Sequence, residues 1–379
     1  MAVITAANHG KFGRTEKDLF DISMDSAYPI VKKYGDTIDL VILANAFGGE
    51  YNNISGLNNR LSAELFDFPV PSIRLDNTSS GGASSIHIAR SILKAGDVHS
   101  ILIIGSEKMS SVPTRQSSSI IASLLDPAER SAGLTLPSLA GFLARMYMER
   151  YGATRESIAQ VSVKNHRNAI WNENAHHRKE VNVAEVLSSR IIASPLTLLE
   201  YCPISDGSVS ILLSSDEHAP SLSGSGARIA GSSISSDTSQ VSLRDDIMYL
   251  DAVRRSSTEA LKQAGITASD VDFAELHDMA SILELVEAEA VGFFADGTAW
   301  REIMEGSMDP DGSTPVNVSG GLLARGHPIA ASSLAQTYEA FVQLTGNAGQ
   351  RQLNDPHYAF SLSMAGFGNS ATSIVYEAI

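Results

Sequence analysis

The segment 317–328 presents a histidine on a glycine-rich turn. Gly320 and Gly321 permit backbone conformations that other residues avoid, and they let a ligand approach closely. His327 follows them, and an apolar helix is expected directly after it, over residues 329–344. An imidazole fixed in this way can act as an acid, a base or a hydrogen-bond donor near neutral pH. The alternative is a histidine that only caps or packs the turn.

The composition restricts the classes of protein to which the chain can belong. It has 379 residues, of which 43% are hydrophobic and 19% charged, so a large core is available. The formal net charge of −15 and the lack of a long Lys or Arg run argue against a nucleic-acid partner or an anionic membrane surface. Cys202 is the only cysteine, which excludes an intrachain disulfide and a cysteine-based zinc site.

Two further observations concern location. No apolar run reaches the length of about 18 residues that spans a bilayer. Residues 1–17 lack the basic-then-apolar pattern of a secretion signal. We therefore expect a cytoplasmic protein without a membrane span.

The chain repeats a pattern of elements. Residues 22–47 run from a helical pattern through a glycine into an apolar strand, and residues 249–277 do the same. Placing Asp39 on Asp272 relates the two segments by an offset of 233 residues. Each half then reaches a small, glycine-rich turn that opens a helix, and another strand follows. Apolar strands that alternate with helices predict an α/β fold in which helices cover buried sheets.

Two segments separate the repeated parts. Residues 111–200 have polar, helical patterns rich in Arg, His and Asn, and we interpret them as an insertion that covers a site. Residues 214–246 are rich in Ser and Gly and are expected to connect the halves, with one strand near 227–230. We therefore expect a first half, an inserted domain and a second half. Their predicted bounds are 1–110 together with 206–245, then 111–205, then 246–379.

Six short motifs occur in an order known from one protein family. They are Thr78-Ser79-Ser80-Gly81-Gly82-Ala83, Val163-Lys164-Asn165-His166-Arg167-Asn168-Ala169, Cys202-Pro203-Ile204-Ser205-Asp206-Gly207, His277-Asp278-Met279, Gly326-His327-Pro328 and Gly366-Phe367-Gly368. In this order and spacing they resemble the thiolase superfamily. The closest match is its archaeal and sterol-carrier-protein-type branch, in which His-Asp stands in place of Asn-Glu. The resemblance covers nearly the whole chain.

The resemblance implies a fold, a reaction and an assembly. Two similar halves would each contribute a mixed five-stranded sheet with helices in layers, and an inserted loop domain would cover the acyl-CoA. Thiolases join or cleave carbon–carbon bonds next to a thioester, with coenzyme A or acyl-CoA as substrate and no metal or covalently bound cofactor. A homodimer paired through an edge strand at residues 100–105, or a homotetramer of such dimers, is implied. A small OB-fold acyl-CoA-associated protein is implied as a further partner.

The resemblance also assigns roles to single residues. His327 would activate the nucleophile, and His277 would donate a hydrogen bond to the thioester oxygen. Other residues would form the oxyanion-binding turns or border the substrate: Ser80, His166, Ser205, Asp278 and Gly366. Asp278 could instead cap a helix over residues 281–291.

The two catalytic cysteines of the family are missing. Aligning Ser80-Gly81-Gly82 with the family's Cys-x-Ser-Gly-Gly places Thr78 at the nucleophile position. The second cysteine falls at Met364, or at Met279 in the sterol-carrier-type pattern. A thiol with a pKa of about 8.5 ionises usefully near neutral pH, whereas a threonine hydroxyl needs a general base and methionine has no acid–base capacity. The two-cysteine cycle therefore cannot run in this chain.

Four explanations stay open. The first is an atypical acyl-CoA C-acyltransferase that performs Claisen condensation or thiolytic cleavage through Thr78 or a neighbouring serine, and we favour it. The second is aldolase-type cleavage of a 3-hydroxyacyl-CoA, for which His327 and an oxyanion site suffice. The third is a non-catalytic subunit that binds acyl-CoA. The fourth is a deliberate replacement of the cysteine that traps a substrate.

Two other polar features are given structural interpretations. His166, His176 and His177 are expected not to form a metal site, because adjacent histidines and a spacing of 10 suit one helix face poorly. Arg325, beside the histidine turn, is expected to face a surface carboxylate rather than a CoA phosphate.

Overall fold

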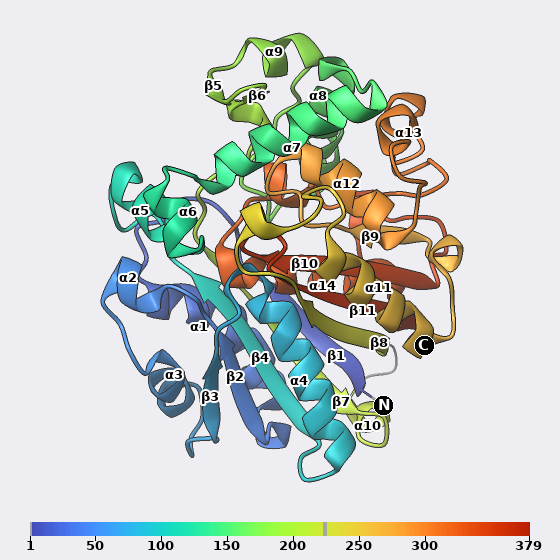
Figure 1. Ribbon diagram of the computed structural model, residues 1–379. Helices are drawn as coiled ribbons and strands as arrows, with labels where there is room; N and C mark the ends of the chain where they lie inside the picture. The colour runs from blue at the N-terminus through green and yellow to red at the C-terminus, as the bar shows by residue number, and fades with distance from the viewer. Residues whose placement is uncertain (1, 223–225) are drawn as a thin grey trace.

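A nine-stranded mixed sheet is the frame of the molecule in the computed structural model, which describes residues 2–222 and 226–379. Its strand order is β3-β2-β4-β7-β1-β8-β11-β10-β9, and helices cover both faces (Figure 1). The strands are β1 (Ala2–His9), β2 (Leu40–Ala44), β3 (Ser72–Leu75), β4 (Ser100–Glu107), β7 (Gly207–Ser215), β8 (Ala227–Ser236), β9 (Phe273–Glu275), β10 (Tyr358–Ala365) and β11 (Ser370–Ala378).

The two halves of the sheet have matching topology, which confirms the duplicated α/β fold. The order β3-β2-β4-β7-β1 of the first half corresponds to β9-β10-β11-β8 of the second, with β9 in the place of β2. The fifth strand expected in the second half is reduced to a single parallel bridge between Ala274 and Val316. The halves join where β1 pairs with β8 at Val3 and Ile4. The sequence analysis groups β8 with the first half, but β8 pairs with β11 along most of its length.

The aspartates that the sequence analysis superimposed make the same contacts. Asp39 Oδ2 accepts the backbone N–H groups of residues 99 and 100 at 2.7 and 3.0 Å. Asp272 Oδ2 accepts those of residues 357 and 358 at 2.8 and 2.7 Å. Each carboxylate thus ties the start of one strand to the start of the neighbouring strand, so the two aspartates occupy equivalent places in the two halves.

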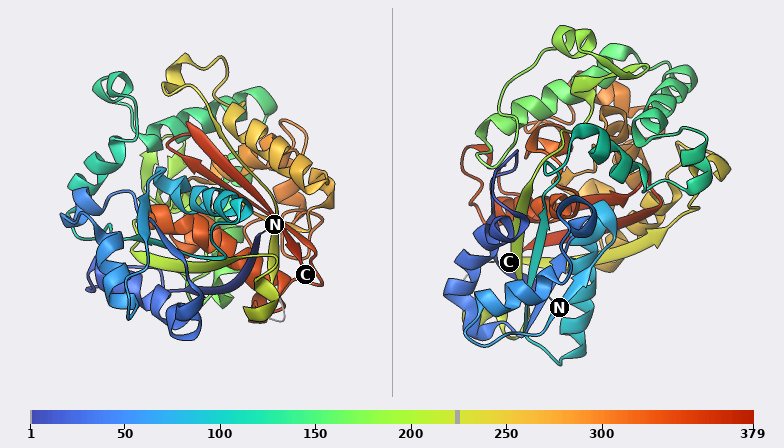
Figure 2. Two further views of the ribbon diagram at one scale, coloured as in Figure 1. Left: turned by 90° about the horizontal axis from the view of Figure 1, so that it is seen from below. Right: turned by 90° about the vertical axis from the view of Figure 1, so that its left-hand side faces the viewer.

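Helices form three layers around the sheet. In the first half they are α1 (Leu19–Tyr34), α2 (Gly48–Asn52), α3 (Leu57–Leu65) and α4 (Gly81–Ala95). After the short α10 (Ala219–Leu222), the second half has α11 (Asp251–Ala264), α12 (Ser281–Val291), α13 (Ala299–Glu305) and α14 (Ile329–Leu344). α4 and α14 lie side by side in the middle, between the two halves of the sheet (Figure 2). α1 and α11 pack on the outer faces.

The predicted insertion is an excursion of helices above the sheet. It consists of α5 (Thr114–Ala122), α6 (Pro127–Ser131), α7 (Leu136–Tyr151), α8 (Arg155–Asn168), α9 (Val183–Ser188) and the hairpin β5 (Ile191–Ala193) and β6 (Leu196–Thr197). Side-chain caps begin several of these helices: Thr135, Thr154 and Asn182 each accept a backbone N–H of the first turn. Figure 1 shows α7, α8 and α9 at the top of the molecule, over α12.

Short turns complete the described chain. The 3-10 turns are η1 (Gly35–Thr37), η2 (Thr78–Ser80), η3 (Ala169–Trp171), η4 (Leu198–Glu200), η5 (Val241–Leu243), η6 (Ala268–Asp270) and η8 (Gly349–Arg351), and η7 (Gly321–Arg325) is a π-helical turn. None of the helices in the described residues is both long and apolar enough to cross a bilayer.

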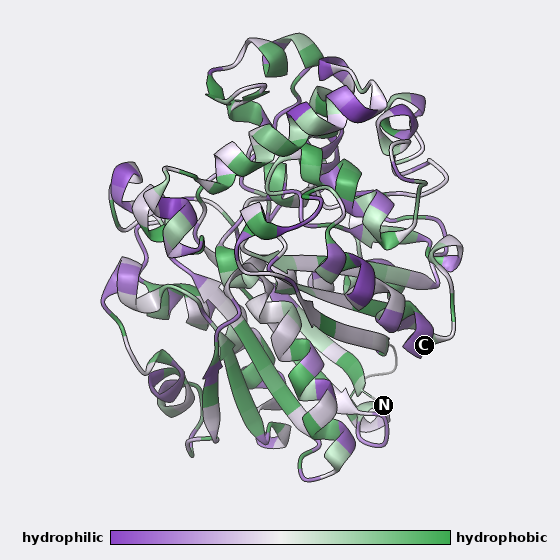
Figure 3. Cartoon of the chain, viewed as in Figure 1, coloured by the Kyte–Doolittle hydropathy of each residue, from purple (hydrophilic) through white to green (hydrophobic). Residues whose placement is uncertain are grey.

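The strand expected to form a dimer edge is central instead. β4 pairs with β2 on one side and β7 on the other, and all of its residues are buried. Its continuous apolar run, visible with that of β2 in Figure 3, reflects burial on both faces of the sheet. The expectation of pairing through residues 100–105 is therefore wrong. The free edge of this half is β3, which pairs only with β2.

Candidate active site

His327 contacts two serines from different parts of the chain. Its Nε2 lies 3.3 Å from Ser79 Oγ, and its Nδ1 lies 2.7 Å from Ser332 Oγ. Ser332 Oγ donates to the Pro328 carbonyl at 2.9 Å. Since a hydroxyl has one proton, the Ser332 oxygen accepts Nδ1–H, and Nε2 keeps a lone pair toward the Ser79 hydroxyl. A hydroxyl, an imidazole and a second hydroxyl that orients the imidazole are thus lined up, which is the geometry that a nucleophile and its base require.

A strained backbone presents Ser79. Ser79 lies in the turn η2 directly before α4, and the preceding Thr78 has φ +47°, which a β-branched residue rarely adopts. The Thr78 N–H donates to Asp76 Oδ1 at 2.8 Å, and the Ser79 carbonyl accepts from Ser363 Oγ at 3.2 Å. These contacts fix the turn and direct Ser79 toward His327.

Thr78 and Ser79 have different surroundings. The sequence alignment places Thr78 at the nucleophile position, but His327 contacts Ser79, and Ser79 lines the adjoining cavity. The Thr78 hydroxyl is buried without a hydrogen-bond partner. Both residues belong to a run of small residues, 78–84, and the placement of the nucleophile at Thr78 stays a prediction.

His277 lies against His327. The two rings meet edge to face with centroids 5.2 Å apart, and His277 Nδ1 lies 3.5 Å from Ser363 Oγ. The backbone N–H of His277 donates to Glu287 Oε2 at 2.7 Å. Burial, followed by His327 and Arg325, lowers the pKa of His277 well below its ordinary value. Burial, followed by the charge of Arg325, lowers the pKa of His327 to about 3. Both imidazoles are therefore neutral near pH 7.

Asp278 holds the turn that carries His327. Its carboxylate accepts the N–H groups of Leu322 at 2.6 Å and Leu323 at 3.3 Å, and the amide of Asn165 at 2.7 Å. Gly321 has φ +58°, and a Cβ there would lie 2.2 Å from Asp278 Oδ2, so only glycine fits. Burial, then Glu284, raises the pKa of Asp278 well above its ordinary value. Asp278 thus caps η7, and the alternative role, a side-chain cap of residues 281–291, is absent.

Ser205 and Ser80 also support the backbone of the site. Ser205 Oγ accepts a hydrogen bond from the backbone N–H of His327 at 3.3 Å, and it lies 2.8 Å from His176 Nδ1. Ser80 Oγ lies 2.7 Å from Thr372 Oγ1 and 3.2 Å from the Ser363 carbonyl oxygen. Both hydroxyls are buried within the protein.

The four other expected site residues divide into two that lie away from the cavity and two that line it. Met364 is fully buried in the core and does not line the cavity. His166 Nδ1 lies 3.2 Å from the Lys179 carbonyl and its ring stacks on His177, away from the cavity lining. Met279 and Gly366 do line the cavity, and Gly366 has φ +62°. The described residues contain no cluster of His, Cys, Asp and Glu suited to a metal ion.

The cavity beside Ser79 and His327 has a volume of about 200 Å³ and mostly apolar walls. Besides the residues already named, it is lined by Met109, Ser118, Ile121, Leu124, Leu136, Pro137, Tyr201, Cys202, Pro203, Ile204 and Ile329. Sequence reasoning did not place Cys202 at the site, although its motif was recognised. Burial, then Asp278, raises the pKa of the Cys202 thiol to about 12, so it is not a thiolate.

Arg325 is buried rather than on the surface. Its guanidinium donates to Glu275 Oε2 at 2.8 Å, and both side chains are about 1% exposed. Glu275 also accepts the Ser319 hydroxyl and backbone N–H. The sequence could not reveal this pair because the residues are 50 positions apart. Its effect on the site is electrostatic, since the charge of Arg325 helps to keep His327 neutral.

Comparisons with known proteins agree with this geometry. The thiolase N-terminal domain matches residues 14–217, and a thiolase C-terminal domain-like family matches residues 233–378. The chain belongs to the thiolase family. It is an acyltransferase-type enzyme of that superfamily, whose members act on CoA substrates without a prosthetic cofactor.

Relatives and structural neighbours fall into several thiolase branches. The chain is 33% identical to the acetyl-CoA acetyltransferase of Methanothermobacter thermautotrophicus, over 90% of this chain and 89% of that protein. It is 28% identical to sterol carrier protein 2 of Homo sapiens, over 81% of this chain and 58% of that protein. An Ltp2-ChsH2(DUF35) aldolase structure has a TM-score of 0.84 at 21% identity, covering 100% of this chain and 97% of that one. Human mitochondrial 3-ketoacyl-CoA thiolase has a TM-score of 0.76 at 16% identity, with 100% and 99% coverage. These two likenesses concern the fold.

Proposed function

We propose that the protein forms or cleaves a carbon–carbon bond next to a CoA thioester, with Ser79 as acyl acceptor and His327 as base. The observation that supports this is the contact of Ser79 Oγ with His327 Nε2, 3.3 Å, on the wall of a largely apolar cavity. Thr78 then positions the turn and does not react.

The acyl transfer can be written with these groups alone. Ser79 Oγ attacks the thioester carbonyl as His327 Nε2 takes its proton, and the CoA sulfur leaves with that proton. His327, neutral again, takes a proton from the α-carbon of a second acyl-CoA. The resulting carbanion attacks the Ser79 ester, and Ser79 Oγ leaves with the proton from His327. His277 donates a hydrogen bond to the thioester oxygen while charge develops there.

A single base therefore does the work of two cysteines. Met279 at the cavity wall and Met364 in the core cannot exchange protons. The oxygen ester on Ser79 is also a poorer acyl donor to a thiol than a thioester is, so a slow thiolase is expected.

A second candidate is aldolase-type cleavage of a 3-hydroxyacyl-CoA. His327 Nε2 takes the proton of the 3-hydroxyl, the bond between C2 and C3 breaks, and the enolate of the shorter acyl-CoA is protonated by His327. No acyl-enzyme is needed, which suits a chain without a thiolate at the nucleophile position. The aldolase named among the structural neighbours favours keeping this reaction in the test.

Assembly belongs to the same proposal. We infer a homodimer or a tetramer of dimers, and a small OB-fold acyl-CoA-associated partner. The neighbour named Ltp2-ChsH2(DUF35) is a complex with a second protein, which supports looking for such a partner. Co-purification from native extract is the direct measurement.

The two reactions are separated by matched variants. Wild type, Ser79→Ala, Thr78→Val and His327→Asn are incubated with acetyl-CoA, and covalent acylation is followed by intact mass. Turnover of a 3-ketoacyl-CoA with CoA, and of a 3-hydroxyacyl-CoA alone, is measured in parallel. Acyltransfer through Ser79 requires an adduct that survives Thr78→Val and is lost in Ser79→Ala. Cleavage of the hydroxyacyl substrate that survives Ser79→Ala favours the aldolase reaction, and an adduct on Thr78 contradicts the proposal.

A further inference from the structure

A polar pocket adjoins the reaction cavity. It has a volume of about 350 Å³ and is lined by Arg14, Met109, Ser110, Ser111, Val112, Pro113, Thr114 and Ile204. Met109 and Ile204 also line the cavity that contains Ser79 and His327. The two hollows therefore share a wall, apolar on the side of the reaction and polar beyond it. An acyl group in the cavity and the Arg14 pocket therefore lie on the two sides of Met109 and Ile204.

Arg14 has no partner within the described chain, where no hydrogen bond or ion pair involves its side chain. The carboxylate beside it, Asp206, is already engaged. Asp206 accepts the N–H groups of Met109 and Ser110 at 2.8 Å and the Ser110 hydroxyl at 2.6 Å, and it lies 3.6 Å from Lys108 Nζ. An unpaired guanidinium in a chain of net charge −15 is therefore available to an anion from outside.

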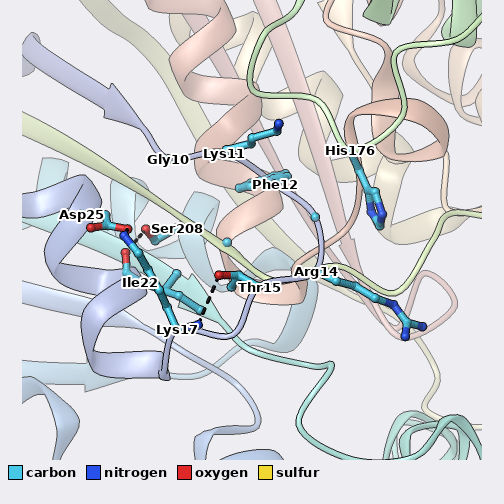
Figure 4. A pocket seen from close by; sticks show the side chains of 12 residues that line it. Gly10, Lys11, Phe12, Arg14, Thr15, Lys17, Ile22, Asp25, His176 and Ser208 are labelled. Atoms are coloured by element: carbon cyan, nitrogen blue, oxygen red, sulfur yellow. Dashed lines mark hydrogen bonds and ion pairs between the residues drawn. The ribbon is translucent and has the colours of Figure 1, made fainter.

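The surroundings of Arg14 on its other side are also cationic. Figure 4 shows a second hollow, of about 450 Å³, lined among others by Lys11, Arg14, Lys17 and His176. Lys17 pairs with Asp25 at 2.6 Å, which neutralises it. In Figure 4 the Arg14 side chain leads away from that pair, toward the side where His176 lies. Lys11 and Arg14 remain as the cations without an acidic partner.

The polar pocket offers donors that suit a carboxylate. The Arg14 guanidinium can bind one in a bidentate manner, which a lysine cannot do. The Thr114 hydroxyl makes no hydrogen bond with the described residues and can add a donor. The hydroxyls of Ser110 and Ser111 already donate, to Asp206 and to Asn52. The pocket is polar and borders the reaction cavity, which fits an anionic group a short distance from the thioester.

We propose that Arg14 binds an anionic group on the acyl part of the substrate, so that the enzyme prefers acyl-CoA thioesters that carry a second carboxylate. The proposal rests on the proposed function, because it extends the acyl site of that reaction. A phosphate of CoA itself has the same anionic chemistry. The pantetheine arm places those phosphates far from the thioester, whereas the Arg14 pocket lies directly beside the reaction cavity.

The test is equilibrium binding, which does not depend on turnover. Affinities of CoA, hexanoyl-CoA and adipyl-CoA are measured for wild type, Arg14→Met, Arg14→Lys and Lys11→Met. Arg14→Met is expected to weaken the affinity for adipyl-CoA about 10-fold, which is the effect of losing a hydrogen bond to a charged group. The affinity for hexanoyl-CoA should stay unchanged. Arg14→Lys should restore part of the loss. Lys11→Met removes the same charge but lines only the second hollow, so it should not discriminate between the two thioesters.

Three results would overturn the inference. Equal affinity of wild type for hexanoyl-CoA and adipyl-CoA removes the preference. If Arg14→Met weakens the affinity for CoA alone as much as it weakens the affinity for adipyl-CoA, Arg14 binds a CoA phosphate. If Lys11→Met and Arg14→Met weaken the affinity for adipyl-CoA equally, the cause is the overall charge of the protein rather than a contact with Arg14. If no acyl-CoA binds to any variant, the proposed function fails as well, so the two failures are distinguishable.

Discussion

At the scale of residues, the base is buried and is oriented by a hydroxyl. Ser332 rather than a carboxylate contacts His327 Nδ1, and Arg325 disfavours a positive charge nearby. His327 is therefore unprotonated at neutral pH, yet it is a weaker base than an imidazole whose pKa is near 7. A neutral but weak base favours reactions in which the proton that His327 accepts is passed on at once, as in both reactions proposed above.

Replacing His327 tests the base directly. His327→Asn should lower turnover about 10²- to 10⁴-fold, the usual contribution of general acid–base catalysis, while the thermal midpoint changes little. His166→Asn is the informative comparison, because the family resemblance places His166 at the substrate and the structure places it against Lys179 and His177. Turnover and melting are measured on the same preparations. A lowered midpoint with unchanged turnover in His327→Asn would mean that His327 only supports its turn.

The same residue makes stability depend on pH. The pKa of His327 falls from 6.5 to about 3 on burial, so between these values the unfolded chain binds a proton that the folded chain does not. Wild type should lose up to about 1.4 kcal/mol of unfolding free energy for each pH unit below 6.5 through this group. His327→Asn lacks this loss. Urea unfolding at about pH 7.5 and about pH 5 should show the variant gaining relative to wild type at the lower pH, and equal differences at both would refute the burial argument.

The sequence identified several residues that the fold brings together, and it missed contacts between residues far apart in the chain. His277, His327 and Gly366 were found from short motifs, and all three lie close together. The assignment of Thr78 to the nucleophile position stays a prediction, beside the contact of His327 with the adjacent Ser79. The contacts of Asp278 with Leu322 and of Arg325 with Glu275 span more than 40 residues, and periodicity carries no information about such pairs.

At the scale of elements, local patterns predicted the helices well. The helices expected over residues 281–291 and 329–344 have those bounds. Their local signals are the apolar runs, with Gly292 after the first helix and Pro328 before the second. Strand neighbours were not predictable in this way. β4 was expected at an edge, but it has a neighbour on each side. An apolar strand has the same sequence pattern whether the strands beside it belong to its own chain or to a partner.

The site also depends on the contact between the helices α4 and α14. A Cβ at Gly82 would lie 2.7 Å from both Ser333 Oγ and Leu334 Cγ, so the two helices cross with no space for a methyl group. Gly82→Ala should cost about 1–3 kcal/mol of unfolding free energy through overpacking. It should also lower turnover, because α4 begins directly after Ser79 and the shift changes the distance from Ser79 to His327.

Gly49→Ala is the matched control for that prediction. Gly49 lies in α2, and a Cβ there has no atom within 4 Å. The same chemical change should therefore be neutral or slightly stabilising, since alanine restricts the unfolded chain. Denaturant unfolding of both variants measures the difference. Equal stability of the two would show that α4 and α14 tolerate a wider separation than the contact implies.

At the scale of the whole molecule, the reaction site is built across the duplication. Ser79 comes from the first half, whereas His277 and His327 come from the second. Within the described residues, the halves of the sheet pair with each other through β1 and β8, and the packed helices α4 and α14 lie between them. Under the proposed function, neither half alone contains both Ser79 and His327, so activity should require both halves.

The outer edge of the sheet leads to the last prediction, which concerns assembly. β3 pairs with β2 only, and Figure 1 shows it at the outer edge of the sheet. Ile73 within this strand is 44% exposed, and an exposed apolar edge strand invites pairing with a second chain. We expect a twofold-symmetric dimer in which β3 of each copy pairs with the other, in place of the pairing through residues 100–105.

A charge on that edge should therefore dissociate the dimer. Ile73→Lys places an ammonium group where an apolar side chain would meet its symmetry copy, so sedimentation velocity should show a dimer for wild type and a monomer for the variant. Ile191→Lys is the control, because Ile191 is 67% exposed on the β5–β6 hairpin, far along the chain from β3. It adds the same charge and should leave the dimer intact. A wild-type monomer at micromolar concentration, or a dimer unaffected by Ile73→Lys, would mean that another surface covers or replaces this edge.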